Sequence, residues 1–390
     1  MSTHDLLTTA DVAIVGGGIV GASIAWHLAQ RGVTNVVILE RESHQGLGST
    51  GRSMGGVRAQ FGTEPNIRMS LYSIAQYRDF EQVVGEPSGY KPHGYLFIAS
   101  SAAHFAHLAA NVAHQQSLGV DNVRLLTADD VGALAPMVRL DDVLGGSYCP
   151  TDGFVDPYSV MNGYTAAALR AGVRIVRNAE VTRLLVEGNR MTGVASTRGV
   201  VSAPNVVMAA GPWVAPLAAT AGVTVPVSPL RRMLLPTEPF AGIPERCPMV
   251  IDMATGFHFR PEGRGLLLAW NDPDEAPCRE PVFDPAFVEK VLLRALERVP
   301  SFIDLAVNPK RGWGGLYEMS PDKHGILGPT PVEGLWCANG FSGHGVMHSP
   351  ATGRVVSDLI VDGRCDVLPW RPFALARFES GELLHEPAVL

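Results

Sequence analysis

Apolar and polar positions near the start of the chain follow a strand, helix, strand pattern. Residues 11–15 form an apolar run with the length of a short buried strand. Residues 21–31 show helical periodicity, with Ile24 and Leu28 on one face, and residues 36–39 are again uniformly apolar. Together the three segments predict a βαβ unit, which takes about 30 residues.

Further along the chain, the pattern predicts a continuation of this sheet and a second, separate sheet. Segments that predict further strands recur at residues 173–176 and 181–186, and wholly apolar runs typical of buried strands at 206–210 and 335–338. Residues 94–100 and 265–270 predict strands of the second sheet, and residues 285–299 predict an amphipathic helix with apolar side chains four apart. A glycine-rich loop and a helix over about residues 351–361 follow the last strand. We therefore expect an α/β fold in which one domain is interrupted by another.

Three glycines after the first predicted strand have the spacing GxGxxG. Gly16 permits a tight turn, Gly18 lets the backbone approach a pyrophosphate, and Gly21 allows the helix to pack closely on the strand. The amides at the start of the helix then face the phosphates. Glu40 ends the second strand, where its carboxylate can accept hydrogen bonds from ribose hydroxyls. The motif predicts a site for the ADP half of a dinucleotide and fits NAD and FAD equally. The chain contains one such motif, which argues against a reductase that uses both.

Charge and cysteine content exclude several classes of protein. The net charge is −7 without a basic cluster, so nucleic acid is not expected as a partner. Five cysteines without a CxxC pair argue against a disulfide reductase and fit free thiols in a reducing cytoplasm. Residues 206–227 are uncharged and long enough to span a bilayer, but prolines interrupt them, so strand, loop and short helix are predicted instead. Without a signal peptide before the first strand, we expect a cytoplasmic protein.

No metal site is expected. His104, His107 and His114 lie in an alanine-rich helical stretch, but no acidic side chain or cysteine lies near them to complete a ligand set. The neighbouring Arg231 and Arg232 stay open between a solvated pair and residues that line the inserted domain near a substrate.

Four further segments carry a family resemblance. Ser49-Thr-Gly-Arg-Ser-Met-Gly-Gly-Val-Arg58 follows the second strand; the others are residues 209–213 (AAGPW), 317–322 (YEMSPD) and 340–345 (GFSGHG). Together with the glycine motif they resemble the D-amino acid oxidase (DAO) superfamily of FAD-dependent oxidoreductases. Within it, they resemble sarcosine oxidase and the β subunits of heterotetrameric sarcosine oxidase and L-proline dehydrogenase. The resemblance spans nearly the whole chain in the right order.

This resemblance implies FAD as the cofactor and a particular domain arrangement. A Rossmann-like FAD-binding domain is expected from residues 1–88, 146–222 and 324–390. An inserted α+β substrate domain, built around an antiparallel sheet, is expected from residues 89–145 and 223–323.

The loops after the strands are expected to hold the flavin. Gly343, His344 and Gly345 can present backbone amides to the pyrimidine end of the reduced flavin, ahead of the last helix, and raise its electron affinity. The expected cofactor contacts are Gly16, Gly18, Ile19, Val20, Gly21, Glu40, Arg41, Ser49, Thr50, Arg52, Ser53, Met54, Val181, Ala210, Gly211, Trp213, Gly340, Gly343, His344, Gly345, Val346 and Met347.

Two departures from the family bear on how the flavin is attached. Monomeric sarcosine oxidases attach it through a cysteine two residues before the active-site tyrosine, and the matching residue here is Gly315. Dimethylglycine and sarcosine dehydrogenases attach it through a histidine in the early loop, and the matching residue here is Arg52. We therefore predict non-covalent FAD.

The expected catalytic residues are Arg58, Tyr317, His258 and His344. Arg58 matches a family arginine that holds the substrate carboxylate, whereas the lysine that assists it is replaced by Met347. Tyr317 is expected to orient the substrate, and His258 to line the flavin face. A surface or flavin-contacting arginine, a structural tyrosine and packed or solvent-facing histidines stay open as alternatives.

The activity that the resemblance implies is oxidation of an amine, most simply a secondary or N-methyl α-amino acid. Hydride passes from the carbon beside nitrogen to the flavin, and the imine hydrolyses in water. An NAD-dependent dehydrogenase and an electron-relaying or structural subunit of a hetero-oligomer are the alternatives. Homo- and hetero-oligomers both stay open.

The electron acceptor is dioxygen, a dye or a partner protein. Oxidases of this family commonly place a lysine near the flavin, but the strand expected there, residues 265–272, has none. A dehydrogenase is therefore expected; the alternative is an oxidase in which a lysine or histidine from elsewhere, such as His258 or His344, supplies the charge.

Overall fold

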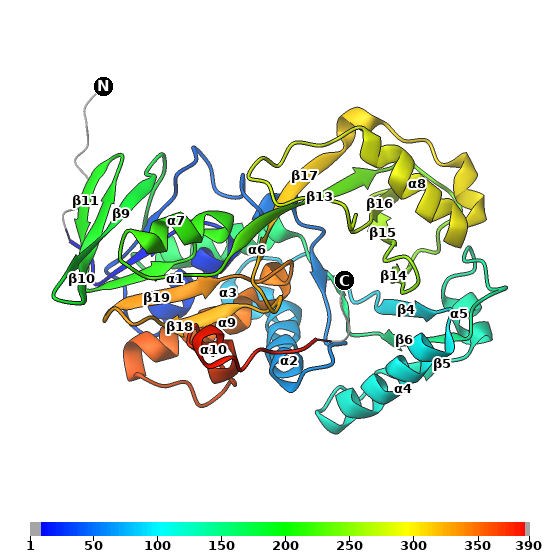
Figure 1. The fold of residues 1–390 in the computed structure, drawn as a ribbon, viewed down its shortest axis with the longest axis horizontal. Helices are drawn as coiled ribbons and strands as arrows, with labels where there is room; N and C mark the ends of the chain where they lie inside the picture. The colour runs from blue at the N-terminus through cyan, green and yellow to red at the C-terminus, as the bar shows by residue number, and fades with distance from the viewer. Residues whose placement is uncertain (1–8, 387–390) are drawn as a thin grey trace.

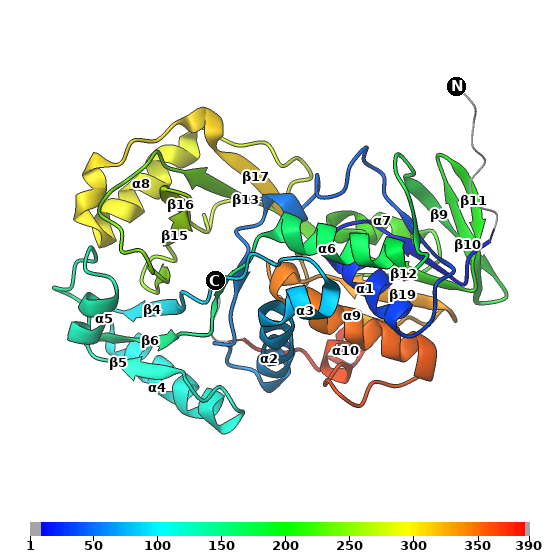
Figure 2. The ribbon, with the colours of Figure 1, turned by 180° about the vertical axis from the view of Figure 1, so that it is seen from behind.

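The computed structural model describes residues 9–386. Two lobes lie side by side, one around a six-stranded sheet and one around an eight-stranded sheet (Figure 1). The same lobes seen from behind show α1, α6 and α9 gathered over the first sheet (Figure 2). An α/β fold is therefore confirmed.

The six-stranded sheet brings the predicted loops to one edge. Its order is β18-β19-β12-β1-β2-β8, and all neighbours are parallel except β18 and β19. The strands are β1 (Val12–Val15), β2 (Val36–Leu39), β8 (Arg174–Val176), β12 (Asn205–Met208), β18 (Ile326–Pro329) and β19 (Leu335–Asn339). Val15 pairs with Leu39 and with Met208, so the carboxyl ends of β1, β2 and β12 are level. Ligands of open α/β sheets bind beyond this edge.

Helices cover one face of this sheet. α1 (Ile19–Gln30) packs against α6 (Pro157–Arg170) and α9 (Gly345–Asp362), and α2 (Glu64–Arg78) packs against α9. α1 begins two residues before its predicted start, because Gly18 has an extended conformation and serves as the N-cap.

The last helix begins six residues earlier than predicted, at Gly345, and continues through Pro350. Proline lacks the N–H that would bond to the Val346 carbonyl four residues before it. The Tyr77 hydroxyl donates to that carbonyl instead. A side chain from α2 therefore satisfies the carbonyl that Pro350 leaves without a backbone donor.

The opposite face of the sheet carries smaller elements. A three-stranded antiparallel sheet is formed by β9 (Val181–Glu187), β10 (Arg190–Ser196) and β11 (Gly199–Ser202). The uncharged run at residues 206–227 forms β12, the short helix η2 (Gly211–Trp213) and α7 (Val214–Ala219), as predicted. Within residues 9–386, no helix combines the length and apolar character of a membrane span.

The eight-stranded sheet is mostly antiparallel and has two different faces. Its order is β17-β13-β16-β15-β14-β4-β6-β5. The strands are β4 (Tyr95–Ala99), β5 (Arg124–Leu126), β6 (Gly145–Cys149), β13 (Ser228–Pro236), β14 (Met249–Asp252), β15 (His258–Glu262), β16 (Gly265–Ala269) and β17 (Trp313–Met319). One face buries Phe259 and Leu268 against Phe287 and Val291 of the amphipathic helix α8 (Ala286–Arg298). The other face is turned toward the carboxyl edge of the first sheet.

Other short elements complete the fold. They are β3 (Gly56–Val57), β7 (Gly153–Phe154), α3 (Phe80–Val84), α4 (Ala102–Ser117), α5 (Ala128–Leu134), α10 (Arg377–Ser380), η1 (Thr50–Arg52), η3 (Pro300–Asp304), η4 (Pro309–Arg311) and η5 (Arg371–Phe373).

The division into two domains stays a prediction, and one of its boundaries needs correction. β6 pairs with β4 in the eight-stranded sheet, although residues from 146 onward were assigned to the FAD-binding domain. Because a boundary inside a paired strand separates hydrogen-bonded neighbours, a boundary after Cys149 fits better.

Candidate active site

One cavity of about 610 Å³ lies between the carboxyl edge of the first sheet and the free face of the second. The predicted catalytic residues Arg58, Tyr317, His258 and His344 all line it. So do the predicted cofactor contacts, except Gly21 and Gly340. Segments distant in sequence are thus brought to one site.

The two exceptions shape the site without lining it. A Cβ on Gly21 would stand 2.0 Å from the Gly16 carbonyl oxygen, so this glycine lets α1 pack on the loop. Gly340 has φ +72°, and a Cβ there would meet Ile326 at 2.9 Å. Both shape the support of the site, and their contact with the cofactor stays a prediction.

The glycine loop is tightly held against the neighbouring strand. Gly16 has φ +109°, and a Cβ there would stand 2.3 Å from the Ala209 carbonyl oxygen. Gly18 differs, because a Cβ there would meet only the Thr50 hydroxyl, at 3.0 Å. Gly18 therefore borders open space in the cavity, as a residue beside a pyrophosphate should.

Glu40 is fixed in place by backbone amides. Its two carboxylate oxygens accept hydrogen bonds from the N–H groups of Gly17 and Glu42, each at 2.9 Å. Both oxygens keep further lone pairs. The carboxylate is thus pre-oriented at the edge of the cavity where a ribose is expected.

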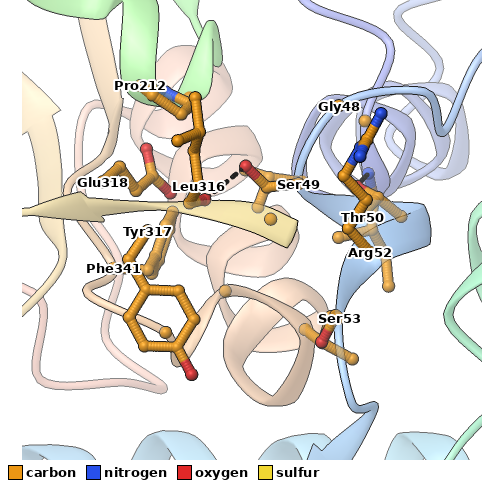
Figure 3. Close-up of a pocket in the computed structure, with 18 of the residues that line it drawn as sticks. Gly48, Ser49, Thr50, Arg52, Ser53, Pro212, Leu316, Tyr317, Glu318 and Phe341 are labelled. Atoms are coloured by element: carbon orange, nitrogen blue, oxygen red, sulfur yellow. Dashed lines mark hydrogen bonds between the residues drawn. The ribbon is translucent and has the colours of Figure 1, made fainter. Parts of the chain in front are cut away.

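The segment after β2 connects the nucleotide end of the cavity to β17. Thr50 Oγ1 accepts the amide of Ile19 at 3.0 Å, so this amide at the start of α1 is already bonded. Ser49 donates to the Leu316 carbonyl at 2.7 Å, as Figure 3 shows. Arg52 Nη1 donates to the Gly314 carbonyl at 2.8 Å. The segment therefore forms a wall between the two sheets.

A second wall is formed by residues that follow β2 and β12. The Arg41 guanidinium stacks on the Trp213 ring, 3.5 Å from its centroid. The Gly211 amide donates to Asn339 Oδ1 at 3.0 Å, which ties this loop to the end of β19.

Strand register places the chemical side chains on the free face of the eight-stranded sheet. Arg232 of β13 lies opposite Gly315 of β17, so it shares a face with Tyr317 two residues on. Leu234 lies opposite Ala269, and Ala269 lies opposite His258, which extends the same face to β15.

Arg58 approaches this face from the other lobe. Its side chain is 1% exposed, and its guanidinium lies over the Phe61 ring at 4.4 Å and the Phe97 ring at 5.5 Å. The atoms Nε and Nη1 are buried without a hydrogen-bond partner. A buried cation left in this state is costly, so a ligand acceptor is expected beside it.

His258 is a neutral hydrogen-bond acceptor. Burial, together with the charges of Arg58 and Arg232, lowers its pKa to about 4. Nδ1 lies 2.9 Å from the Gly256 carbonyl oxygen, which can only accept, so we assign the proton to Nδ1. Nε2 is then left with a lone pair.

Tyr317 and Glu318 leave β17 on opposite sides, as Figure 3 shows. Burial raises the pKa of the Tyr317 hydroxyl, and the charges of Arg232 and Arg58 partly oppose this shift. The ring packs against Gly343, where a Cβ would stand 2.5 Å from it. Tyr317 therefore connects the sheet face to the loop before α9.

In that loop, the His344 ring packs edge-on against Phe61 at 5.1 Å. Burial lowers the pKa of His344 well below its ordinary value. The backbone N–H of His344 donates to the Phe341 carbonyl at 2.9 Å, so this amide is not free for a ligand. The expected role of amide donor therefore passes, as a prediction, to Gly343 and Gly345.

Glu318 is a partly buried acid of the cavity lining that sequence reasoning missed. Burial raises its pKa to about 7, although the amides of Gly340 and Phe341 oppose the shift. Its Oε2 atom has no partner among the described residues.

We expect Glu318 to make the protein less stable as pH rises from 5 to 8. The folded state holds the proton up to about pH 7, whereas the unfolded chain releases it near 4.5. This stabilisation is therefore complete below the unfolded pKa and is lost as pH rises through the folded pKa. Melting temperatures of the FAD-loaded protein should fall less with pH in Glu318→Gln than in the wild type. An exposed control, Glu333→Gln, should keep the wild-type slope; equal slopes in all three proteins would contradict the assignment.

Similarity to known proteins agrees with this site. The family model described as "DAO: FAD dependent oxidoreductase" matches residues 11–359. The chain belongs to the DAO family. FAD is therefore the cofactor, rather than NAD, and the protein is an FAD-dependent oxidoreductase.

Individual relatives cover nearly the whole chain. FAD-dependent oxidoreductase domain-containing protein 1 of Xenopus laevis is 35% identical over 98% of this chain and 85% of its own length. 4-Methylaminobutanoate oxidase (formaldehyde-forming) of Paenarthrobacter nicotinovorans is 28% identical over 93% of this chain and 45% of its own length. The crystal structure of L-proline dehydrogenase from P. horikoshii superposes with a TM-score of 0.90 and 29% identity, over 97% of this chain and all of that one.

The residues present fit FAD. The cavity is bordered at one end by the glycine loop and the fixed Glu40 carboxylate, and it continues to the free sheet face. The open space at Gly18 suits a pyrophosphate, and the loop before α9 suits the flavin ring. The individual contacts stay predictions.

The two positions that would carry a covalent flavin link lie side by side. A Cβ on Gly315 would stand 3.0 Å from the Cβ of Arg52. Because neither glycine nor arginine forms the family's thioether or histidyl bond, we expect the denatured protein to have the mass of the polypeptide alone. Acid precipitation should leave all flavin in the supernatant. An adduct of flavin mass would show that another residue forms the link.

Arg232 also lines the cavity, and the sequence analysis left its role open. A pair of arginines in an apolar strand was the available signal, but only the register with β17 shows that Arg232 shares a face with Tyr317.

Proposed function

We propose that this DAO-family protein oxidises a secondary or N-methyl α-amino acid. The observation that carries the proposal is Arg58, a buried cation that lines the cavity with two unpartnered nitrogens. Among the described residues, no acidic side chain forms an ion pair with it. A substrate carboxylate would supply the missing acceptor, since the guanidinium fork binds carboxylates through two parallel hydrogen bonds.

The surroundings favour a neutral substrate amine. Burial, the main cause of the low pKa of His258, would also lower the pKa of an ammonium group bound beside it. The lone pair on His258 Nε2 can accept a hydrogen bond from the amine N–H. Tyr317 offers a hydroxyl from the same sheet face. A neutral nitrogen has the lone pair that forms the C=N bond as hydride leaves the neighbouring carbon.

The reaction balances with two electrons removed from the substrate. The carbon beside nitrogen loses a hydride, and bound FAD supplies its acceptor. The iminium product then reacts with water to give a carbonyl compound and an amine. No protein group has to accept the hydrogen from carbon, so the protein's task is to bind and orient.

Two relatives support a secondary amine. The names of 4-methylaminobutanoate oxidase and L-proline dehydrogenase both specify substrates whose nitrogen carries two carbon substituents.

Anaerobic loss of the yellow flavin absorbance tests the proposal. Sarcosine, N-methylalanine and proline, in both enantiomers where they exist, should reduce the flavin faster than glycine or alanine. Reduction without added partner proteins would also exclude a subunit that only relays electrons. Failure of every amino acid, or a preference for primary amines, would contradict the proposal.

A cytoplasmic location remains part of the proposal and rests on the free cysteines.

We expect reduced flavin to react slowly with dioxygen. A lysine beside the ring, as oxidases of this family commonly have, would favour electron transfer to dioxygen, but the described lining contains no lysine. The nearest lysine in sequence, Lys290, pairs with Asp272 at 2.5 Å, and the low pKa of His258 leaves it uncharged. Substrate-reduced protein mixed with air-saturated buffer should reoxidise more slowly than it turns over with a dye. Rapid reoxidation with stoichiometric peroxide would identify an oxidase.

A further inference from the structure

Arg232 is a cation of the cavity lining to which the proposed reaction assigns no substrate group. It lines the cavity from β13, and its guanidinium lies 5.9 Å from the centre of the Tyr317 ring. Its Nε is buried without a partner, and Nη1 makes one long hydrogen bond, 3.3 Å to the Asp272 carbonyl. Arg232 is therefore only partly satisfied by the protein.

The acidic side chains near Arg232 are engaged with other cations. The Asp272 carboxylate pairs with Lys290 at 2.5 Å. Glu275 pairs with Arg231 at 2.9 Å. Among the described residues, none forms an ion pair with Arg232. Asp272 and Glu275 favour its charge only from a distance, so the guanidinium has no carboxylate in direct contact.

Arg58 and Arg232 act on the same two side chains. The charges of both lower the pKa of His258 and oppose the rise in the pKa of Tyr317. Both also line the same cavity, Arg232 beside the Tyr317 ring and Arg58 over the Phe61 ring that packs against His344. Two guanidinium charges in a partly desolvated space repel each other, and one carboxylate neutralises only one of them.

We propose that Arg232 binds a second acidic group of the substrate. The preferred substrate is then a secondary amino acid with two carboxylates, one held by Arg58 and the other by Arg232. This inference rests on the proposed function, because it needs the amino acid to occupy the space between these arginines. The phosphates of FAD are not the partner of Arg232, since they belong beside Gly18 and the start of α1, whereas Arg232 shares its sheet face with Tyr317 and His258.

A matched pair of substrates isolates the second charge. N-methylaspartate and N-methylasparagine have nearly the same size. The side chain of the first ends in a carboxylate, and that of the second ends in a neutral amide. In each enantiomer series, we expect the wild type to favour the diacid in kcat/KM by about 10- to 100-fold, the range of a charge-assisted hydrogen bond.

The variant Arg232→Gln should remove this preference. It should lower kcat/KM for N-methylaspartate by about 10- to 100-fold and leave N-methylasparagine nearly unchanged. Arg232→Lys, which keeps the charge without the planar fork, should restore part of the preference. Binding can be measured without turnover by titrating flavin absorbance with succinate and with butyrate. Arg232→Gln should weaken the binding of succinate and leave the binding of butyrate unchanged.

The outcomes separate this inference from the proposed function. If monoacids and diacids reduce the wild-type flavin equally well, Arg232 has no carboxylate partner, whereas the proposed function stands. Equal losses for both substrates in Arg232→Gln, with a shifted flavin potential, would assign the residue to the flavin instead. Absence of reduction by any amino acid overturns both.

Discussion

Gly18→Val should produce a folded protein that no longer binds FAD. The structure leaves open space at this position, since a Cβ would meet only the Thr50 hydroxyl at 3.0 Å, and a hydroxyl can shift by a few tenths of an ångström. The branched side chain would then fill the space beside the glycine loop that the pyrophosphate is expected to occupy. We expect purified Gly18→Val to be colourless and inactive, with the far-ultraviolet circular dichroism of the wild type. It should also lack the rise in melting temperature that added FAD gives the wild-type apoprotein.

The neighbouring glycine Gly21 provides the matched control. A Cβ there would stand 2.0 Å from the Gly16 carbonyl oxygen, so Gly21→Val should disturb the packing of α1 and reduce the yield of folded protein. The contrast separates loss of the cofactor from loss of the fold. A full flavin complement in Gly18→Val would contradict the assignment of the pyrophosphate to this loop.

Local rules were sufficient for the nucleotide-binding half of the fold. The run at residues 36–39 and the glycine spacing depend on neighbours close in sequence, and β2 and the turn at Gly16 appear as predicted. The predicted start of α9 was wrong because the helix continues through Pro350. The Tyr77 hydroxyl, from more than 250 positions earlier, bonds the carbonyl that this proline cannot reach with an N–H. Such compensation has no local signature in the sequence.

The substrate half of the site depended on strand register. His258 stayed open between lining the flavin face and packing elsewhere, and the pairing of β15 with β16 places it on the cavity face. Arg232 could not be assigned for the same reason, since a one-residue slip against β17 would turn it to the opposite face. Glu318 was missed because its neighbours, the amides of Gly340 and Phe341, come from the end of another sheet.

Arg58 offers the sharpest test of substrate recognition. Arg58→Ala should lower kcat/KM for a carboxylate substrate roughly 100-fold or more, because the carboxylate would enter a desolvated pocket without its partner. Amines without a carboxylate should change little. The comparison is proline with pyrrolidine, or sarcosine with dimethylamine, measured by anaerobic flavin reduction. Equal losses for both members of a pair would remove Arg58 from carboxylate recognition.

The same arginine should contribute little to the stability of the substrate-free protein. Its guanidinium is buried without an ion pair, so Arg58→Met keeps most of the volume and removes a charge that no carboxylate contacts directly. Arg298 is also a buried arginine, but it forms ion pairs with Asp142 at 2.9 Å and Asp252 at 3.3 Å. Arg298→Met should therefore lower the free energy of unfolding by roughly 3 kcal/mol, since it leaves a buried carboxylate unpaired. Arg58→Met should leave that free energy unchanged or raise it, as measured by denaturant unfolding without substrate. If Arg58→Met lowers the free energy of unfolding as much as Arg298→Met does, Arg58 stabilises the fold and is not reserved for binding a ligand.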